Sequence, residues 1–443
     1  MIQRYTTPEM GVLWTELAKK TNWLEVEAAV LQARGKLGEI PEIIHKLTRR
    51  VKITEAILAR ADELEKTNDH DLIAFILAVT EQLPDKVKPH FHAGMTSYDD
   101  EDTGLAMTLV ASLGLILEKM NRLRRVIAAR AEKHRYTTMI GRTHFIHAEP
   151  ITFGLKLLGW LDVVERHIAN LQKVREDARV GKISGAVGTY VLDPTVEELA
   201  CGYLGLKPAR ISTQILSRDI IVRYISALVA VANSLDRFAT EIRHLAGTDI
   251  NEVAEFKRPG AKGSSAMPGK SFLRNPIKSE NVCSLARMMR GYLIPAYECE
   301  VVWCERTLEN SAAERIFLPD ATILLDFMIK RFADTLEKLE VFPEHMKRNL
   351  QKTGGIIFAQ RVMMALTGKG MARDQAYDLL EGICFSVKRG TFQTEDGKTF
   401  RDLVAAHPEI TANLSLEEID VCFDPQQSLK HVDTIFKRFD LAI

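Results

Sequence analysis

The sequence lacks any excess of charge of one sign. Its 443 residues contain 59 Lys and Arg and 59 Asp and Glu, so the formal net charge is zero when the 12 histidines are neutral. A chain of balanced charge generates no overall field that favours nucleic acid or an acidic membrane surface. We therefore expect neither as a partner, although positive charge can still gather locally in a pocket.

Paired cysteines and long apolar runs are also missing. The six cysteines form no Cys-x-x-Cys pair and show no metal-ligand spacing with histidine, which indicates buried or idle thiols in a reducing compartment rather than disulfides. Residues 1–5 provide no apolar core of signal-peptide length, and no uninterrupted apolar run reaches about 18 residues. These absences predict a cytoplasmic location.

Strand signals are sparse, whereas helical periodicity dominates the chain. Between Asp102 and His134, apolar residues recur at intervals of three and four, which is typical of one face of a helix. Similar patterns cover residues 151–179, 218–256, 280–310 and 321–339. Several exceed the usual length of globular helices, so the sequence predicts an all-α protein built on a long-helix bundle.

The length of the chain suffices for two or three domains. We expect a helical N-terminal domain over residues 1–93, a central long-helix domain over 94–345 and a smaller helical C-terminal domain over 346–443. The segment from Val222 to Ile242 is apolar around much of its circumference. This pattern predicts burial on more than one side, and an isolated subunit would expose part of it, so we expect an oligomer.

The most informative stretch, residues 259–276, separates two helical patterns. Its glycines permit unusual backbone angles and its prolines forbid a continuous helix. The same stretch carries the hydroxyls of Ser264 and Ser265 and the ammonium of Lys270. Hydroxyls, an ammonium group and a run of backbone N–H groups favour a moving part of an active site over a slack loop.

A second cluster occupies residues 141–150, where a glycine and a proline bracket His144, His147, an arginine and Glu149. Histidine titrates near neutrality and can therefore give or take a proton. Either histidine alone is more often structural. The His-x-x-His spacing also fits a metal, but no further ligand set lies nearby, so we expect no metal site.

His70 and the segment 91–99 each allow two interpretations. His70 lies between carboxylates that would raise its basicity, and Asn68 or Asp69 could equally cap the helix that follows. Segment 91–99 fits a turn with an N-cap, yet hydroxyls and N–H groups at a helix start also suit an anion. The glycine-rich stretch 181–189 lacks the order of a Walker motif.

Several motifs agree with one family. The segments Ser264–Lys270, Thr96–Asp99 and Gly141–His144 resemble the fumarase/aspartase superfamily, whose members eliminate fumarate from succinyl compounds. Residues 4–10, 182–190, 211–214, 305–319 and 429–432 resemble the branch that acts on succinylated purine nucleotides. The resemblance thus covers nearly the whole chain.

The resemblance implies an all-helical fold of three domains, in which helices from four subunits form a central bundle. It implies a homotetramer whose active sites each combine segments of three chains. The implied reaction releases fumarate from adenylosuccinate, giving AMP, and from the succinylated aminoimidazole carboxamide ribotide. No cofactor is implied.

Residue roles follow from the resemblance, position by position. Ser264 matches the general base, which needs a dry, electropositive pocket because a serine hydroxyl is a weak base in water. Lys270 supplies positive charge, and His144 matches the general acid. Glu280 orients a histidine or the loop. His70 is counted with these catalytic residues. The implied substrate contacts are Arg4, Tyr5, Asp69, Asp71, His92, Thr96, Ser97, Gln214, Arg306, Ser311 and Arg315.

The chain departs from the family pattern at three places. Three extra residues separate Lys270 from Asn275, one extra residue precedes His70, and Ile220 follows Arg218-Asp219 where the family often has arginine. All the proposed reacting groups remain, so we expect an active enzyme.

Two alternatives stay open. One is a related lyase such as argininosuccinate lyase, or a cycloisomerase; Arg4, Tyr5, Arg306 and Arg315 favour a phosphorylated nucleotide instead. The other is a non-catalytic oligomeric scaffold like the lens crystallins of this superfamily.

Overall fold

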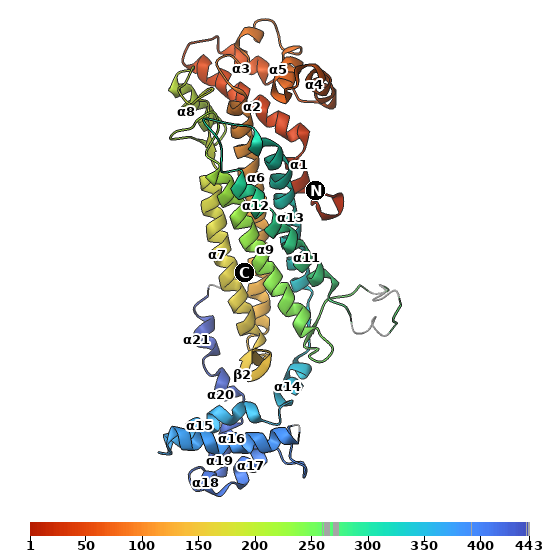
Figure 1. Ribbon diagram of the computed structural model, residues 1–443, viewed down its shortest axis with the longest axis vertical. Coiled ribbons are helices and arrows are strands. Elements are labelled where there is room, and N and C mark those ends of the chain that lie inside the picture. Colours follow the sequence, from red (N-terminus) through yellow and green to blue (C-terminus); the bar gives the residue numbers. More distant parts are fainter. Residues whose placement is uncertain (259, 261–265, 269–273, 391, 440, 442–443) are drawn as a thin grey trace. The chain divides into compact units, whose positions relative to one another are not determined.

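The computed structural model describes residues 1–258, 260, 266–268, 274–390, 392–439 and 441. Long helices dominate it (Figure 1), and they confirm the predicted all-α class. The longest are α6 (Ser97–Lys133), α7 (Phe153–Asp177), α9 (Asp219–Leu245) and α13 (Glu309–Glu337).

The shorter helices lie before, between and after these long ones. They are α1 (Pro8–Leu13), α2 (Glu16–Lys36), α3 (Ile43–Thr48), α4 (Glu55–Asn68), α5 (Asp71–Thr80), α8 (Pro194–Tyr203), α11 (Ile277–Gly291), α12 (Leu293–Glu298), α14 (Pro343–Gln351), α15 (Ala359–Gly368), α16 (Arg373–Arg389), α17 (Phe400–Ala406), α18 (Pro408–Thr411), α19 (Leu416–Cys422), α20 (Gln426–Leu429) and α21 (Val432–Phe436). Single 3₁₀ turns are η1 (Gln3–Tyr5), η2 (Lys88–His90) and η3 (Ile356–Phe358).

Strands in the described part of the chain form three small two-stranded sheets. The antiparallel pairs are β1 (Thr138–Thr143) with β2 (Ile146–Thr152) and β5 (Val253–Ala254) with β6 (Glu340–Val341). β3 (Val180–Gly181) and β4 (Lys207–Pro208) pair in parallel. The predicted cluster 141–150 lies within the β1–β2 hairpin.

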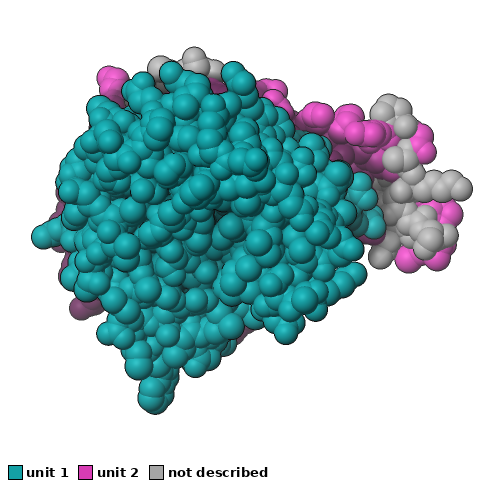
Figure 2. Space-filling view, turned by 90° about the horizontal axis from the view of Figure 1, so that it is seen from above, with its two compact units in different colours: residues 1–123, 164–237, 281–332 teal, residues 124–163, 238–280, 333–443 magenta. Residues whose placement is uncertain are grey.

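The chain forms two compact units, coloured separately in Figure 2. Unit 1 comprises residues 1–123, 164–237 and 281–332, and unit 2 comprises residues 124–163, 238–280 and 333–443. One core cluster of unit 1 is made by residues between 23 and 91, and one of unit 2 by residues between 356 and 423. The division into three contiguous domains stays a prediction.

Contacts between side chains hold the long helices of unit 1 together. His167 of α7 lies 2.8 Å from the hydroxyl of Ser234 of α9. The hydroxyl of Tyr224, also on α9, lies 2.8 Å from that of Thr322 on α13. These polar contacts are embedded in apolar packing, so unit 1 contains the predicted long-helix bundle.

The structure corrects one argument for an oligomer. The apolar residues that repeat between Val222 and Ile242 are all buried in the single chain; Leu228 and Phe238, for example, have no exposed surface. The chain itself therefore covers this face, and α9 is not evidence for a subunit interface.

Two predicted helix boundaries were also wrong. The helix expected over residues 218–256 ends at Leu245, and Asn251 beyond it has a φ of 48° that no helix continues through. The helix expected over 280–310 is divided into α11 and α12, with irregular chain up to Glu309. The first break falls at Gly291, because glycine has low helix propensity.

Helix α6 is long and apolar enough, over an 18-residue window with a mean hydropathy of 1.4, to cross a membrane by composition alone. Half of that window is buried inside the structure, and the first turn of α6 carries two acidic residues, Asp99 and Asp100. Charged groups are costly in hydrocarbon. These features are those of the core helix of a globular unit.

Candidate functional site

Four consecutive acidic residues lie in the first two turns of α6. We call Asp99, Asp100, Glu101 and Asp102 the acidic tetrad. Carboxylates are favoured at a helix N-terminus, where backbone N–H groups lack partners. Since successive helical residues are about 100° apart, the four side chains point in four directions. Three of them are nevertheless buried, and burial of a carboxylate requires a partner.

The structure provides each carboxylate with a cation from a different part of unit 1. The pairs are Asp99 with Lys182, Asp100 with His92 at 3.2 Å, Glu101 with Arg315 at 3.7 Å, and Asp102 with Arg218 at 2.8 Å. The tetrad therefore joins four segments that are remote in sequence.

Arg218 makes the most extensive of these contacts. Its guanidinium donates two bonds to Asp102, at 2.8 and 3.0 Å, and two to Glu314, at 2.9 and 3.2 Å. Burial lowers the pKa of Arg218, but the charges of Asp102 and Glu314 outweigh burial and raise it. The planar fork of arginine suits such double pairing. Arg218 thus connects the start of α6 to the start of α13.

Four residues predicted from sequence converge beside this network. His70 Nε2 lies 3.3 Å from the Ser97 hydroxyl, and Asp71 forms an ion pair with Arg315 at 2.7 Å. His70 is the residue before α5, whereas Asp69 closes α4 with a φ of 50°. The expected capping of α5 by Asn68 or Asp69 is therefore wrong.

A second group of predicted contacts surrounds Tyr98. The Arg306 guanidinium lies 3.9 Å from the centre of the Tyr98 ring and donates to Gln214 at 2.9 Å. Ser311 is hydrogen-bonded to the Tyr98 hydroxyl, and burial raises the pKa of Tyr98. A cavity of about 200 Å³ opens here, lined by Tyr98, Glu101, Ser311 and Arg315 and, from the N-terminal segment, by Trp14, Lys19 and Trp23.

The glycine-rich stretch 181–189 is tied to the same helix start. Asp99 accepts from the backbone N–H of Thr96 at 2.8 Å and from that of Gly185 at 3.3 Å. Gly188 has a φ of 82°, and a Cβ there would lie 2.1 Å from the Ser212 carbonyl oxygen. Asp99 therefore links the stretch 181–189 to Thr96, the residue before α6.

Arg4 and Tyr5 lie on η1, away from these groups. The Tyr5 ring packs edge-on against Phe327, with 5.3 Å between ring centres. Phe327 follows Arg315 on α13 by about three helical turns. Unit 1 thus gathers eight of the eleven predicted substrate contacts near the start of α6. Asp69 is exposed, and Tyr5 lies further along α13.

Unit 2 holds His144 at the tip of the β1–β2 hairpin. His144 and Phe145 have φ values of 52° and 61°, the conformation of a type I′ turn. Asn and Gly favour that turn, and other residues cost about 1 kcal/mol each or more there. Arg142 anchors the hairpin through two bonds to Glu252, at 3.1 and 2.7 Å. The turn therefore keeps His144 at a strained and projecting position.

Two further predicted positions of unit 2, His147 and Glu280, differ in exposure. Burial, together with the charge of Arg142, lowers the pKa of His147. Glu280 is exposed on the first turn of α11, whereas its neighbour Ser279 is buried and donates to Glu255 at 2.7 Å. Ser264 and Lys270, the predicted base and its cation, lie outside the described residues.

Sequence reasoning missed the tetrad and two of its partners, Lys182 and Arg218. A signal was present, because four acidic residues in succession at a helix start are unusual in a chain of balanced charge. Their cations could not be assigned, since each pairing spans a long separation in sequence.

Known proteins resemble this chain along its whole length. Residues 3–291 match a family model described as lyase, and residues 355–439 match one described as adenylosuccinate lyase C-terminus. The chain is 47% identical to adenylosuccinate lyase of Synechocystis and 44% identical to that of Bacillus subtilis, over the full length of each chain.

Solved structures show the same fold. A fumarate lyase from a Mesorhizobium species superposes with a TM-score of 0.87 at 25% identity and covers 98% of each chain. The 3-carboxy-cis,cis-muconate lactonizing enzyme of Pseudomonas putida gives a TM-score of 0.87 at 29% identity over 98% of this chain and 96% of that one.

The Arg218 network generates a stability prediction. Replacing Arg218 by Met leaves Asp102 and Glu314 buried without their cation, so we expect a loss of about 3–5 kcal/mol in the free energy of unfolding, measured in urea. The control Arg223→Met removes an exposed arginine from the same region and should cost at most about 1 kcal/mol. Adding Asp102→Asn and Glu314→Gln to Arg218→Met should recover most of the lost free energy of unfolding, because no buried charge is then left without a partner. Equal effects of the two single changes would contradict the assignment.

A second prediction concerns pH. Burial, with the charge of Asp71, raises the pKa of Glu101 from 4.5 to about 7. The folded state therefore disfavours the ionised form, and its stability falls as the pH rises from 4.5 through 7. Glu101→Gln removes this dependence, so the variant should gain about 2 kcal/mol over the wild type between pH 5.5 and pH 8.

Urea unfolding at both pH values and one protein concentration measures this difference. Glu118→Gln, an exposed carboxylate on the same helix, serves as the control and should show no gain. A constant difference between Glu101→Gln and the wild type across this range would refute the shift.

Proposed function

The chain belongs to the adenylosuccinate lyase family, and on that basis we propose that it eliminates fumarate from adenylosuccinate, giving AMP. We extend the proposal to the succinylated aminoimidazole carboxamide ribotide, which carries the same succinyl group on nitrogen. Full-length similarity to two adenylosuccinate lyases carries the proposal, and the grouping of predicted nucleotide contacts in unit 1 supports it.

The reaction requires two proton movements. A base removes a proton from the carbon beside a carboxylate, that electron pair forms the fumarate double bond, and the carbon–nitrogen bond breaks. The departing nitrogen then takes a proton from an acid. We assign the base to Ser264 and the acid to His144. Lys270 stabilises the negative charge that develops on the carboxylate, and Glu280 and His70 orient the groups that react.

The substrates carry a phosphate and two carboxylates, so the site must supply cations. Arg306 and Arg315 lie in unit 1 beside Ser97, Gln214 and the cavity lined by Ser311. Their planar donors suit phosphate and carboxylate groups. Arg315 is paired with Asp71 at 2.7 Å, and an anionic ligand would compete with that carboxylate.

We also propose a homotetramer with active sites shared between subunits. In place of α9, the support is the exposed apolar surface on and after α12, where Ile294, Val301 and Trp303 are each 70–71% exposed. Phe145 beside His144 is 81% exposed, as expected for a turn that another chain would cover. We propose a cytoplasmic location, three domains, and no cofactor, metal, nucleic-acid or membrane partner.

The assay of purified protein with adenylosuccinate, followed by absorbance, tests the function. We expect formation of AMP and fumarate and no turnover of argininosuccinate. The reverse result would assign the chain to the argininosuccinate branch, and binding without elimination would favour a scaffold. Ser264→Ala and His144→Ala should each lower turnover by about two orders of magnitude or more, because each removes a proton-transfer group.

A matched control is Ser386→Ala, which removes an exposed hydroxyl of α16 that bonds within its own helix. It should retain normal turnover. Near-normal activity of either Ser264→Ala or His144→Ala would contradict the assigned roles while leaving the family membership intact.

The tetramer predicts a specific mass. Light scattering should give four times the 49.9 kDa of the chain. Trp303→Glu, which places a charge on the exposed apolar surface, should shift the population towards smaller species and lower activity together. An active monomer would end the proposal of shared sites.

A further inference from the structure

His92 is held by two carboxylates that the reaction scheme does not use. It precedes α6 with a φ of 56°, a conformation that is unusual for histidine. Glu27 of α2 accepts from the His92 backbone N–H at 3.0 Å and lies 2.7 Å from the ring Nδ1. Asp100 of the acidic tetrad lies 3.2 Å from the same ring nitrogen.

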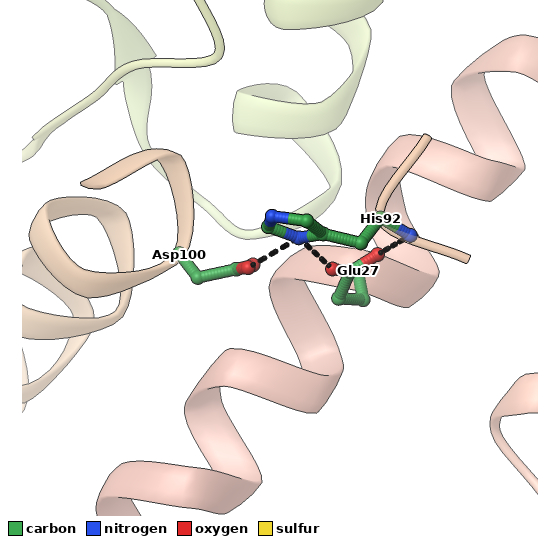
Figure 3. Close-up of side chains that lie close together, drawn as sticks. All are labelled: Glu27, His92 and Asp100. Carbon is green, nitrogen blue, oxygen red and sulfur yellow. Dashed lines mark hydrogen bonds and ion pairs between the residues drawn. The ribbon is translucent and has the colours of Figure 1, made fainter. Parts of the chain in front are cut away.

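Figure 3 shows how these three side chains lie. Both carboxylates approach Nδ1, and the other ring nitrogen points away from them. Glu27 and Asp100 have no exposed surface, whereas the His92 side chain is 21% exposed. The histidine therefore presents one edge to a buried acidic pair and keeps partial access to solvent.

The charges of Glu27 and Asp100 favour a protonated His92 ring. Two buried carboxylates beside a neutral ring would leave two negative charges without compensation, which is costly in a protein interior. Two charged groups near the cluster, Asp99 and Arg34, already have partners. Asp99 contacts Lys182, and Arg34 of α2 pairs with Glu39 at 3.0 Å while it donates to the Ala93 carbonyl oxygen. His92 is thus the cation that contacts both carboxylates.

We propose that Glu27 and Asp100 are positioning residues that keep His92 in its imidazolium form and direct its Nε2–H towards an anionic group of the substrate. The first part stands on the geometry of the cluster, and the substrate contact rests on the proposed function. His92 then acts as a fixed cation, in contrast to a histidine that transfers a proton during the reaction.

The protonation energetics agree with this assignment. Burial lowers the pKa of His92, but the hydrogen bonds to Asp100 and Glu27 outweigh burial and raise it to about 10. Burial and the charge of Glu27 also raise the pKa of Asp100. Both shifts favour a cluster that retains its proton at neutral pH.

A metal ion is the competing occupant. One donor atom from each of the three residues lies within 4.8 Å of the others, so a divalent ion could replace the shared proton. The 2.7 Å between Nδ1 and Glu27 is a hydrogen-bond distance, and an ion between these atoms would have to separate them. The geometry therefore favours the proton, and the test includes the metal.

Deuterium exchange at the histidine Cε1 position, followed by mass spectrometry from pH 5 to pH 11, gives the titration midpoint of His92 in the intact protein. In the wild type we expect a midpoint near pH 10. Glu27→Gln and Asp100→Asn should each lower it by about two units, a hundredfold loss of proton affinity. Glu197→Gln, a buried carboxylate bonded to Ile183 and Tyr190, should not change it.

The wild-type titration alone can overturn the proposal. A midpoint at or below pH 7 would do so even if neither variant folds, and so would variants that leave the midpoint unchanged. Stoichiometric binding of Zn²⁺ by wild-type protein after dialysis against EDTA, absent from Asp100→Asn, would assign the cluster to a metal instead.

Kinetics with adenylosuccinate test the substrate contact. For Asp100→Asn we expect KM to rise about tenfold per pH unit above the lowered midpoint, with kcat nearly constant and wild-type KM flat over the same range. A rise in KM of Asp100→Asn that does not depend on pH would indicate a merely structural role for Asp100. That result would overturn the proposed contact between His92 and the substrate. If the protein does not act on adenylosuccinate at all, the proposed function fails, while the titration still decides the state of His92.

Discussion

The burial of carboxylates in the first two turns of α6 is the constraint on which unit 1 depends. Three of the four in the acidic tetrad lie out of solvent, and a buried carboxylate needs a cation nearby. Because the side chains diverge around the helix, no single segment satisfies all four. Lys182, Arg218, Arg315 and His92 come from four separate segments, and each brings neighbouring residues with it. Arg315, for example, also pairs with Asp71 at 2.7 Å.

The sequence predicted the architecture where local pattern is strong. Apolar spacing indicated α6, α7 and much of α13, because each helix buries one face over many turns. It did not indicate the β1–β2 hairpin, whose turn is formed by His144 and Phe145 instead of the usual Asn-Gly. It also misjudged α9, since an all-round apolar helix looks the same whether its own chain or a second subunit covers it.

Some residues of the candidate site could likewise be predicted from the sequence, whereas the contacts that hold them could not. Short motifs identified His70, Asp71, Ser97 and Arg315, and the structure brings these four together in unit 1. The ion pairs that position them were beyond sequence reasoning, because Asp102 and Arg218 are separated by more than a hundred residues. The spacing of residues that are close in sequence carries no information about a pairing over that distance. Ser264 and Lys270 lie outside the described residues, so their roles depend on family resemblance.

Two histidines of the predicted site, His144 and His92, have different surroundings, and these surroundings suit them to different roles. His144, the proposed general acid, is exposed at a strained turn in unit 2. His92 faces two buried carboxylates, which bind its proton tightly and fix the ring from one side. A general acid must release its proton within each catalytic cycle, so a histidine held in this way is poorly suited to that task. The same constraint makes it a dependable cation, because an imidazolium that does not titrate near neutral pH attracts an anion equally well across that range. The carboxylates at the start of α6 therefore argue against His92 as the general acid, which agrees with the proposal of His144 for that role.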